Sequence, residues 1–282
     1  MESRMEISKA GTVTLGDIVV NRMGFGAMRI TGQGVWGEPE DHDGALAVLT
    51  RAVELGVNFI DTADAYGPEV SENLIREALS PYEGITIATK GGLTRSGPDQ
   101  WSPDGTPTHL REALEASLKR LGLERIDVYQ FHRPDPNVPF EESIEALVNL
   151  KNEGKIRHLG LSNVTVAQLE SARSMTEIVS VQNRYNITDA QESAAVLEYC
   201  THNSIAFIPW FPVGGGGDLT ALTAVAKKHG ATPHQIALAW LLAKSPIMLP
   251  IPGTKSIDHL EENIAAAAIV LSEEDMAELG SE

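Results

Sequence analysis

The sequence predicts an α/β protein of the (β/α)8 class, a TIM barrel, with a short N-terminal β-hairpin. Eight short apolar, β-branched runs alternate with longer amphipathic segments, as repeated βα units around a parallel sheet require. The length of 282 residues also suits one barrel of about 250 residues with additions. No linker or change in composition divides the chain, so we expect a single domain over residues 1–282.

The expected strands follow the opening hairpin, Gly11–Val20, in regular succession. Their apolar runs are each bounded by turn residues or by polar side chains. An open doubly wound sheet is the main alternative, but the first strand lacks the GxGxxG pattern that such sheets usually carry. The eight strands are expected at Arg22–Met28, Val57–Thr62, Ile85–Lys90, Ile126–His132, Ile156–Leu161, Ile178–Asn183, Ile205–Trp210 and Ile247–Ile251.

The intervening segments are expected to be helices that bury one face against the sheet. Gly44–Leu55, Leu110–Leu121 and Glu142–Asn152 repeat apolar residues at positions i, i+3, i+4 and i+7. Thr108 is the expected N-cap of the second of these, and Gly122 is expected to end it. The seventh unit is expected to contain two helices, Leu219–His229 and Pro233–Lys244.

Composition excludes several classes of partner. A formal charge of -17 opposes binding to nucleic acid or anionic membrane, because both depend on cationic side chains. The single cysteine, Cys200, lies in the helical stretch Ser193–Asn203, and the chain cannot form an internal disulfide. The charged N-terminus and the lack of an apolar run of about 20 residues predict a cytoplasmic protein. The histidines show no metal-binding spacing, so no metal site is expected.

Polar side chains stand at the ends of three predicted strands. Asp61 ends the second strand and Tyr66 follows in the next loop, while Lys90 ends the third strand and His132 the fourth. Each alone has an ordinary explanation, as a turn cap, a loop anchor, a solvated strand end or a core histidine. Because the C-terminal ends of barrel strands surround one mouth, the four side chains are expected to converge. Together they indicate a catalytic site.

The stretch GVNFIDTADAYG, residues 56–67, resembles the aldo-keto reductase superfamily, whose pattern has an Asp and a Tyr five residues apart. Lys90 and His132 fall where the other two catalytic residues of that family lie. The resemblance runs from Met23 to Asn263, includes the blocks GLSN (160–163), VQN (181–183) and IPGT (251–254), and is greatest to bacterial members similar to pyridoxal reductases. It implies an NADPH-dependent enzyme that reduces aldehydes or ketones to alcohols.

The residue types suit carbonyl reduction independently of this resemblance. Hydride arriving at a carbonyl carbon produces an alkoxide, which must receive a proton from an acid. A free phenol has a pKa near 10, and the cation of Lys90 beside Tyr66 is expected to lower that pKa. Asp61 would hold Lys90 in place and keep it charged. His132 would orient or polarise the carbonyl through a hydrogen bond.

The resemblance also implies a set of cofactor contacts. Ser162, Asn163 and Gln182 would hydrogen-bond the nicotinamide carboxamide, and Trp210 stands where an aromatic residue, frequently Tyr, stacks on the nicotinamide ring. Two departures weaken the inference of NADPH preference. Many members have a basic residue at the position of Gly253 and Arg at that of His259. The remaining implied contacts are Pro252, Glu262 and Asn263, the last two with the adenine.

Two further segments could bind the phosphates of a nucleotide. The run FPVGGGGD, residues 211–218, is either a flexible linker or a pyrophosphate cradle, and we favour the cradle because glycine amides can approach phosphate closely. Thr254 and Lys255 stand at an expected helix N-terminus, where unpaired amides and the helix dipole favour phosphate. The candidates in the glycine-rich run are Phe211, Pro212 and Gly214.

The substrate side is less specific. Trp36, Trp101 and Arg133 are candidate walls of the substrate pocket, although each could equally be a loop anchor or a solvated charge. They would suit a small carbonyl compound, such as pyridoxal or another aromatic aldehyde. The sequence gives no oligomeric state.

Three other functions suit a barrel. A regulatory barrel that binds the nucleotide without turnover would not need all four catalytic residues. A lyase forming a Schiff base on Lys90 would leave Gln182 and Trp210 unexplained. A phosphosugar isomerase would use phosphate loops near the seventh and eighth strands but no nicotinamide site.

Overall fold

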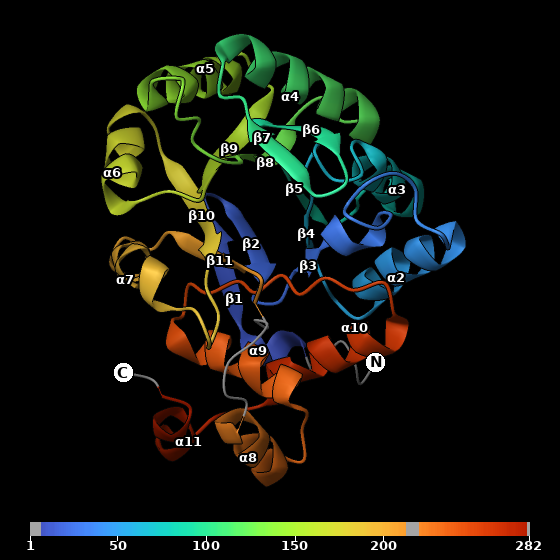
Figure 1. Ribbon diagram of the computed structural model, residues 1–282, viewed down its shortest axis with the longest axis vertical. Helices are drawn as coiled ribbons and strands as arrows, with labels where there is room; N and C mark the ends of the chain where they lie inside the picture. The colour runs from blue at the N-terminus through green and yellow to red at the C-terminus, as the bar shows by residue number, and fades with distance from the viewer. Residues whose placement is uncertain (1–6, 213–219, 281–282) are drawn as a thin grey trace.

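A curled parallel sheet forms the centre of the molecule (Figure 1). The computed structural model describes residues 7–212 and 220–280. Its strands pair in the order β11-β10-β9-β8-β5-β4-β3, so chain neighbours are sheet neighbours throughout, which excludes the open doubly wound alternative. The strands are β3 (Phe25–Gly26), β4 (Phe59–Asp61), β5 (Thr86–Gly91), β8 (Ile126–Phe131), β9 (Ile156–Ser162), β10 (Ile178–Arg184) and β11 (Ala206–Trp210).

Residues 247–251 close the sheet into a barrel. The Phe207 amide donates to the carbonyl of Ile247 at 2.9 Å, and on the other edge the Gly24 amide donates to the carbonyl of Pro250 at 2.9 Å. The prediction of a full eighth strand at Ile247–Ile251 was wrong in extent, since only the bridge from Phe207 to Met248 forms. Pro250 has no N–H to donate, so a regular ladder cannot continue through it.

Glycine is required where the first and last barrel segments meet. A Cβ atom on Gly253 would lie 2.2 Å from the carbonyl oxygen of Gly26, and one on Gly26 would lie 2.6 Å from that of Ile251. The first strand also proved shorter than the expected Arg22–Met28, because the 3₁₀ helix η2 (Ala27–Ile30) begins directly after β3. The absence of a basic side chain at position 253 therefore has a local steric reason.

The predicted N-terminal hairpin is confirmed and closes the amino-terminal end of the barrel. It consists of β1 (Thr12–Leu15) and β2 (Ile18–Asn21), paired antiparallel. Alternate residues of the hairpin are buried and pack with the side chains that fill the barrel interior. This interior cluster contains Val13, Leu15, Ile18, Val20, Phe59, Ala88, Val128, Val179, Ala206, Ile208, Leu249 and Ile251.

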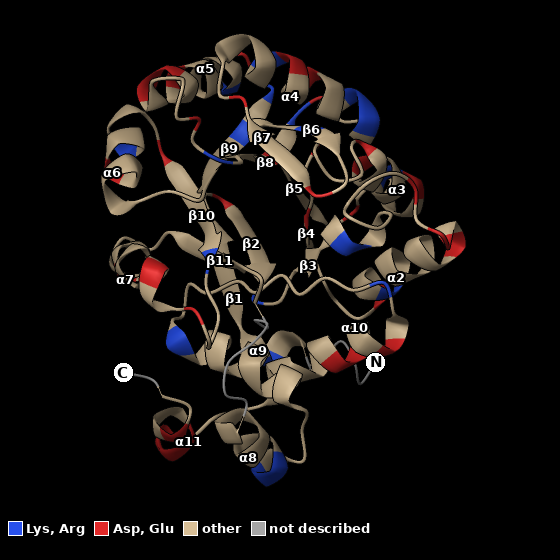
Figure 2. Ribbon diagram, in the orientation of Figure 1, with Lys and Arg blue, Asp and Glu red and all other residues tan. Residues whose placement is uncertain are grey.

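Helices surround the sheet, and their charged residues lie largely on the outside of the ring (Figure 2). The two predicted helices of the seventh unit are confirmed as α8 and α9. The helices are α2 (His42–Glu54), α3 (Val70–Leu79), α4 (Pro107–Leu121), α5 (Phe140–Asn152), α6 (Val166–Met175), α7 (Ala194–His202), α8 (Thr220–His229), α9 (Pro233–Lys244), α10 (Ile257–Ala265) and α11 (Glu273–Glu278), with short 3₁₀ helices at Ser8–Ala10, Gln191–Ser193 and Ala266–Ala268.

The ends of α4 show one wrong and one confirmed prediction. Thr106, not Thr108, is the N-cap, and its hydroxyl accepts the amide proton of His109, because Pro107 takes the first helical position. Gly122 ends the helix in the left-handed conformation, with φ of 68°, as predicted. In α7, burial raises the pKa of the Cys200 thiol to about 12, which leaves it unreactive at neutral pH.

The described residues provide neither a membrane-spanning helix nor a cluster of metal ligands. No helix there combines the length and the apolar character needed to cross a bilayer. In the same residues, no group of three or more His, Cys, Asp or Glu side chains is placed to hold a metal ion.

Candidate active site

The four residues singled out at the strand ends converge at one end of the barrel. The Lys90 ammonium lies 2.7 Å from an Asp61 carboxylate oxygen and 3.3 Å from the Tyr66 hydroxyl. The Tyr66 ring meets the His132 ring edge to face, with 5.9 Å between their centroids. All four side chains are buried or nearly so. The predicted convergence is therefore present in the structure.

Lys90 is a fully buried cation whose three protons are all donated. Its Nζ atom donates to Asp61, to the Thr62 carbonyl oxygen at 2.8 Å and to the Tyr66 hydroxyl. Burial opposes the charge on Lys90, but the carboxylate of Asp61 and then Tyr66 outweigh it, and its pKa is raised. Lys90 therefore stays protonated and points one N–H at the phenol.

The Asp61 carboxylate is held from its other side by two glutamines. Its Oδ1 atom accepts from the Gln130 amide at 2.9 Å and from the Gln182 amide at 2.8 Å, while Oδ2 accepts from Lys90. A buried carboxylate needs several donors, and here three side chains supply them. Gln130 was not among the residues predicted from the sequence, although a polar glutamine at a buried position of the run IDVYQF, residues 126–131, was a visible signal.

The net effect on Tyr66 differs from the prediction. Burial is the largest influence and raises the pKa of the phenol, and the opposing effect of Lys90 does not fully offset it. The expectation of a lowered pKa was wrong because the same burial that strengthens the lysine's influence also disfavours the phenolate. Tyr66 is consequently protonated at neutral pH and can act as a proton donor.

His132 is a neutral imidazole. Burial lowers its pKa well below the usual value, and the positive charges of Lys90 and Arg133 lower it further. Its Nδ1 atom is buried without a hydrogen-bond partner among the described residues. A neutral ring can donate one N–H to a carbonyl oxygen, which fits the predicted orienting role better than a charged imidazolium would.

The predicted nicotinamide contacts lie directly beside these four residues. Asn163 donates to the His132 carbonyl oxygen at 3.1 Å and to the Ser162 hydroxyl at 2.9 Å, and it accepts the indole N–H of Trp210 at 3.1 Å. These bonds fix the half-buried Trp210 ring at the end of β11. Gln182 serves Asp61 as well, so its amide group is already partly engaged.

The predicted phosphate and adenine contacts follow β11 and the closing segment. Gly214 lies outside the described residues, while Phe211 is exposed directly after Trp210 and Pro212 follows it. Ser256, and not Thr254 or Lys255, is the N-cap of α10, so the expected helix start was placed too early. The others lie on or beside α10: Pro252, Thr254 and Asn263 buried, Gly253 and Glu262 partly exposed, Lys255 and His259 exposed.

Two of the three predicted substrate residues lie near Tyr66. The Trp101 ring meets the Tyr66 ring at a centroid distance of 6.3 Å, nearly perpendicular. Trp36 forms a parallel backbone β-bridge with Gly67, the residue after Tyr66. Trp101 belongs to a hairpin formed by β6 (Leu93–Gly97) and β7 (Gln100–Pro103), which lies between β5 and α4. Arg133 is exposed, and only its charge effect on His132 links it to the site.

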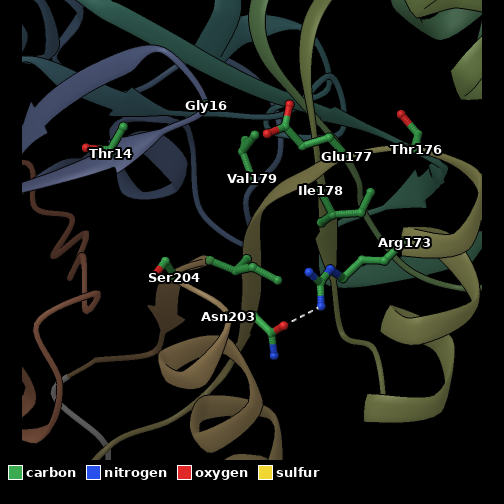
Figure 3. Close-up of a pocket in the computed structure, with 10 residues that line it drawn as sticks. Thr14, Gly16, Arg173, Thr176, Glu177, Ile178, Val179, Asn203 and Ser204 are labelled. Carbon is green, nitrogen blue, oxygen red and sulfur yellow. Dashed lines mark hydrogen bonds between the residues drawn. The ribbon is translucent and has the colours of Figure 1, made fainter.

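A separate pocket of about 460 Å³ opens at the other end of the barrel (Figure 3). It lies beside the turn of the N-terminal hairpin at Gly16 and the start of β10 at Ile178. Arg173 points into it, but its guanidinium is engaged by Asn203 at 2.8 Å. This pocket contains none of the four converging residues, so the candidate active site lies at the opposite mouth.

The fold and the site define a class of protein: a barrel enzyme whose mouth holds a phenol, a buried ammonium–carboxylate pair and a neutral imidazole. Residues 22–281 match the model of the aldo/keto reductase family, and the chain belongs to this family of oxidoreductases acting on carbonyl compounds with NADP(H). The family and the fold predicted from the sequence are both confirmed.

Sequence similarity to known proteins extends over nearly the whole chain. An uncharacterized oxidoreductase of Schizosaccharomyces pombe is 53% identical, with 99% of this chain and 92% of that protein covered. Pyridoxine 4-dehydrogenase of Escherichia coli is 46% identical, with 96% and 97% covered. A solved aldo-keto reductase from Klebsiella pneumoniae in complex with NADPH has 25% identity and a TM-score of 0.79, with 96% and 94% covered.

Proposed function

We propose that this chain, as one domain over residues 1–282, reduces an aldehyde or ketone to the alcohol with NADPH, and that Tyr66 protonates the product oxygen. The observation that carries the proposal is the hydrogen-bonded series from Asp61 through Lys90 to Tyr66. Its buried cation faces the phenol that must release a proton. NADPH supplies hydride to the carbonyl carbon when it is bound.

The residues around the mouth fit such a cofactor. Trp210 presents a ring fixed by Asn163, and stacking on a nicotinamide needs such a held aromatic face. Ser162 and Gln182 place polar groups beside it at the ends of β9 and β10. The solved Klebsiella relative in complex with NADPH supports this choice.

Each of the four candidate catalytic side chains has its own part in the carbonyl reduction. A carbonyl oxygen lying between Tyr66 and His132 can accept a hydrogen bond from each. Tyr66 gives its proton to that oxygen as negative charge develops, and Lys90 stabilises the phenolate that remains. Asp61, held by Gln130 and Gln182, keeps Lys90 charged and aimed at the phenol. The buried setting strengthens each of these interactions.

We further propose an aromatic aldehyde such as pyridoxal as the substrate class. Trp101 beside Tyr66, and Trp36 next to Gly67, would provide flat apolar walls. The name of the Escherichia coli relative, pyridoxine 4-dehydrogenase, supports this class.

A cytoplasmic location of the protein stays a prediction.

A Schiff-base lyase is disfavoured by the state of Lys90. A nucleophilic amine must be neutral and reachable, whereas Lys90 is fully buried and donates all three protons. A regulatory barrel that binds the nucleotide without turnover is disfavoured, because binding alone does not need the buried proton-donating series of Asp61, Lys90 and Tyr66.

Tyr66→Phe tests the proposed acid. The variant keeps the ring that packs on Trp101 and His132, so it should fold and bind NADPH like the wild type. Reduction of pyridoxal should fall by about 100-fold or more, because only the transferable proton is lost. A rate near that of the wild type, followed by NADPH absorbance, would remove Tyr66 as the acid.

Lys255→Ala tests the preference for NADPH. Lys255 is exposed next to the N-cap of α10, and no ion pair involves it among the described residues, so its charge is available to a ribose phosphate. The variant should bind NADPH about tenfold more weakly, while NADH binding barely changes. Titration of both nucleotides decides: equal effects on the two would remove Lys255 from the site.

A further inference from the structure

Arg95, on the first strand of the β6–β7 hairpin, connects three loops at the barrel mouth. A guanidinium group has five N–H donors, and Arg95 uses all five on backbone carbonyl oxygens. Two acceptors lie in the loop after β3, one lies in the loop after β4, and two lie in the hairpin itself. They are the carbonyls of Gly34 at 2.9 Å, Val35 at 2.8 Å, Ala65 at 2.9 Å, Gly97 at 3.2 Å and Gln100 at 3.0 Å.

The same guanidinium packs against both candidate substrate walls. Its central carbon lies 3.6 Å from the centroid of the Trp101 ring and 5.7 Å from that of the Trp36 ring. Contacts of this kind between a planar cation and an aromatic face are favourable. Arg95 therefore fixes the backbone that carries each tryptophan and also contacts each ring.

One of the tied carbonyls belongs to Ala65, the residue directly before Tyr66. The Trp101 ring in turn meets the edge of the Tyr66 ring at 6.3 Å. Loss of Arg95 would move the pocket wall relative to the proton donor, while Lys90 on β5 still holds the Tyr66 hydroxyl. Arg95 thus acts on the placement of a substrate ring and leaves the proton-donating series in place.

We propose that Arg95 is a positioning residue that holds Trp101 and Trp36 as the walls of the substrate pocket, and that it thereby favours flat aromatic carbonyl compounds over small aliphatic ones. This specificity role rests on the proposed carbonyl reduction. Lysine cannot replace arginine here, because an ammonium is a point charge with three donors and has no planar face.

The kinetic test compares Arg95→Lys and Arg95→Met with the wild type on pyridoxal and propanal, at saturating NADPH. Arg125→Lys, an exposed arginine before β8, is the matched control. In both Arg95 variants kcat/KM for pyridoxal should fall about tenfold or more, mainly through KM, because a disordered wall loses contact area. Propanal should change less than threefold, and the Kd for NADPH should not change. Equal losses for the two aldehydes, or an unchanged value for pyridoxal, would overturn the proposal.

Amide hydrogen exchange gives a second readout that does not depend on turnover. Arg95→Met should accelerate exchange about tenfold in peptides covering residues 31–38 and 93–103, which carry Trp36 and Trp101, and change it little in the strands of the barrel. If the wild type reduces neither aldehyde, the proposed function fails, and exchange alone decides whether Arg95 orders the walls. Unchanged exchange in these two segments would refute the positioning role.

Discussion

The buried pair of Lys90 and Asp61 makes a sharp prediction about stability. Their side chains are 0% and 2% exposed, and the charged atoms are 2.7 Å apart. Removing one partner of such a pair leaves an uncompensated buried charge and typically costs about 3 to 5 kcal/mol. For Asp61→Asn the cost is limited to about 5 kcal/mol, because neutralising a lysine at pH 7 costs about that much.

The double variant should be more stable than the sum of the single effects predicts. Lys90→Met leaves the Asp61 carboxylate with two glutamine donors, whereas Lys90→Met with Asp61→Asn leaves no charge, and the new amide can accept from the same glutamines. We expect a coupling free energy of about 2 to 3 kcal/mol. Urea unfolding at pH 7, followed by circular dichroism without nucleotide, measures it.

An exposed ion pair provides the control for this cycle. Arg111 and Glu153 lie on α4 and directly after α5, and their side chains are about two-fifths exposed. The cycle of Arg111→Met and Glu153→Gln should show a much smaller coupling, because solvent screens exposed charges. Additive effects of the Lys90 and Asp61 variants, within about 0.5 kcal/mol, would refute the reasoning.

Three further predictions concern His132, Gly253 and Lys90. His132 is neutral when folded and its pKa is lowered, so the unfolded chain binds more protons below about pH 6.5 and the protein loses stability as the pH falls. His132→Asn should remove about 1 kcal/mol of this loss between about pH 7.5 and 5.5, measured by urea unfolding; an unchanged pH slope would contradict it. Gly253→Ala should lower the melting temperature more than Gly154→Ala, whose added methyl group meets nothing within 4 Å and costs only the strain of a left-handed backbone with φ of 80°; an equal effect would argue against the close backbone contact at Gly253. Treating the protein with pyridoxal and borohydride should leave Lys90 unmodified, because all three protons of its ammonium group are donated. Mass spectrometry that shows a reduced adduct on Lys90 would instead favour a lyase.

The sequence alone determined the class of fold and singled out four candidate catalytic side chains, which the structure brings together. The alternation of apolar runs with amphipathic segments reflects burial, which acts on each element locally, so the order of strands and helices could be predicted. The ends of helices and strands were predicted less accurately than their order. Thr106 rather than Thr108 caps α4, and residues 247–251 form one bridge rather than a strand, because proline and neighbouring backbone decide those details.

The tertiary structure decided which side chains share a contact and what that does to their charge. The sequence placed Tyr66, Lys90 and Asp61 at strand ends, but it could not show that burial outweighs Lys90 and raises the pKa of the phenol. It gave no sign that Arg95 binds carbonyls from three loops, since those loops are far apart along the chain. Periodicity reports the environment of one element at a time, whereas desolvation and hydrogen bonding depend on distances between elements, which exist only once the barrel has closed.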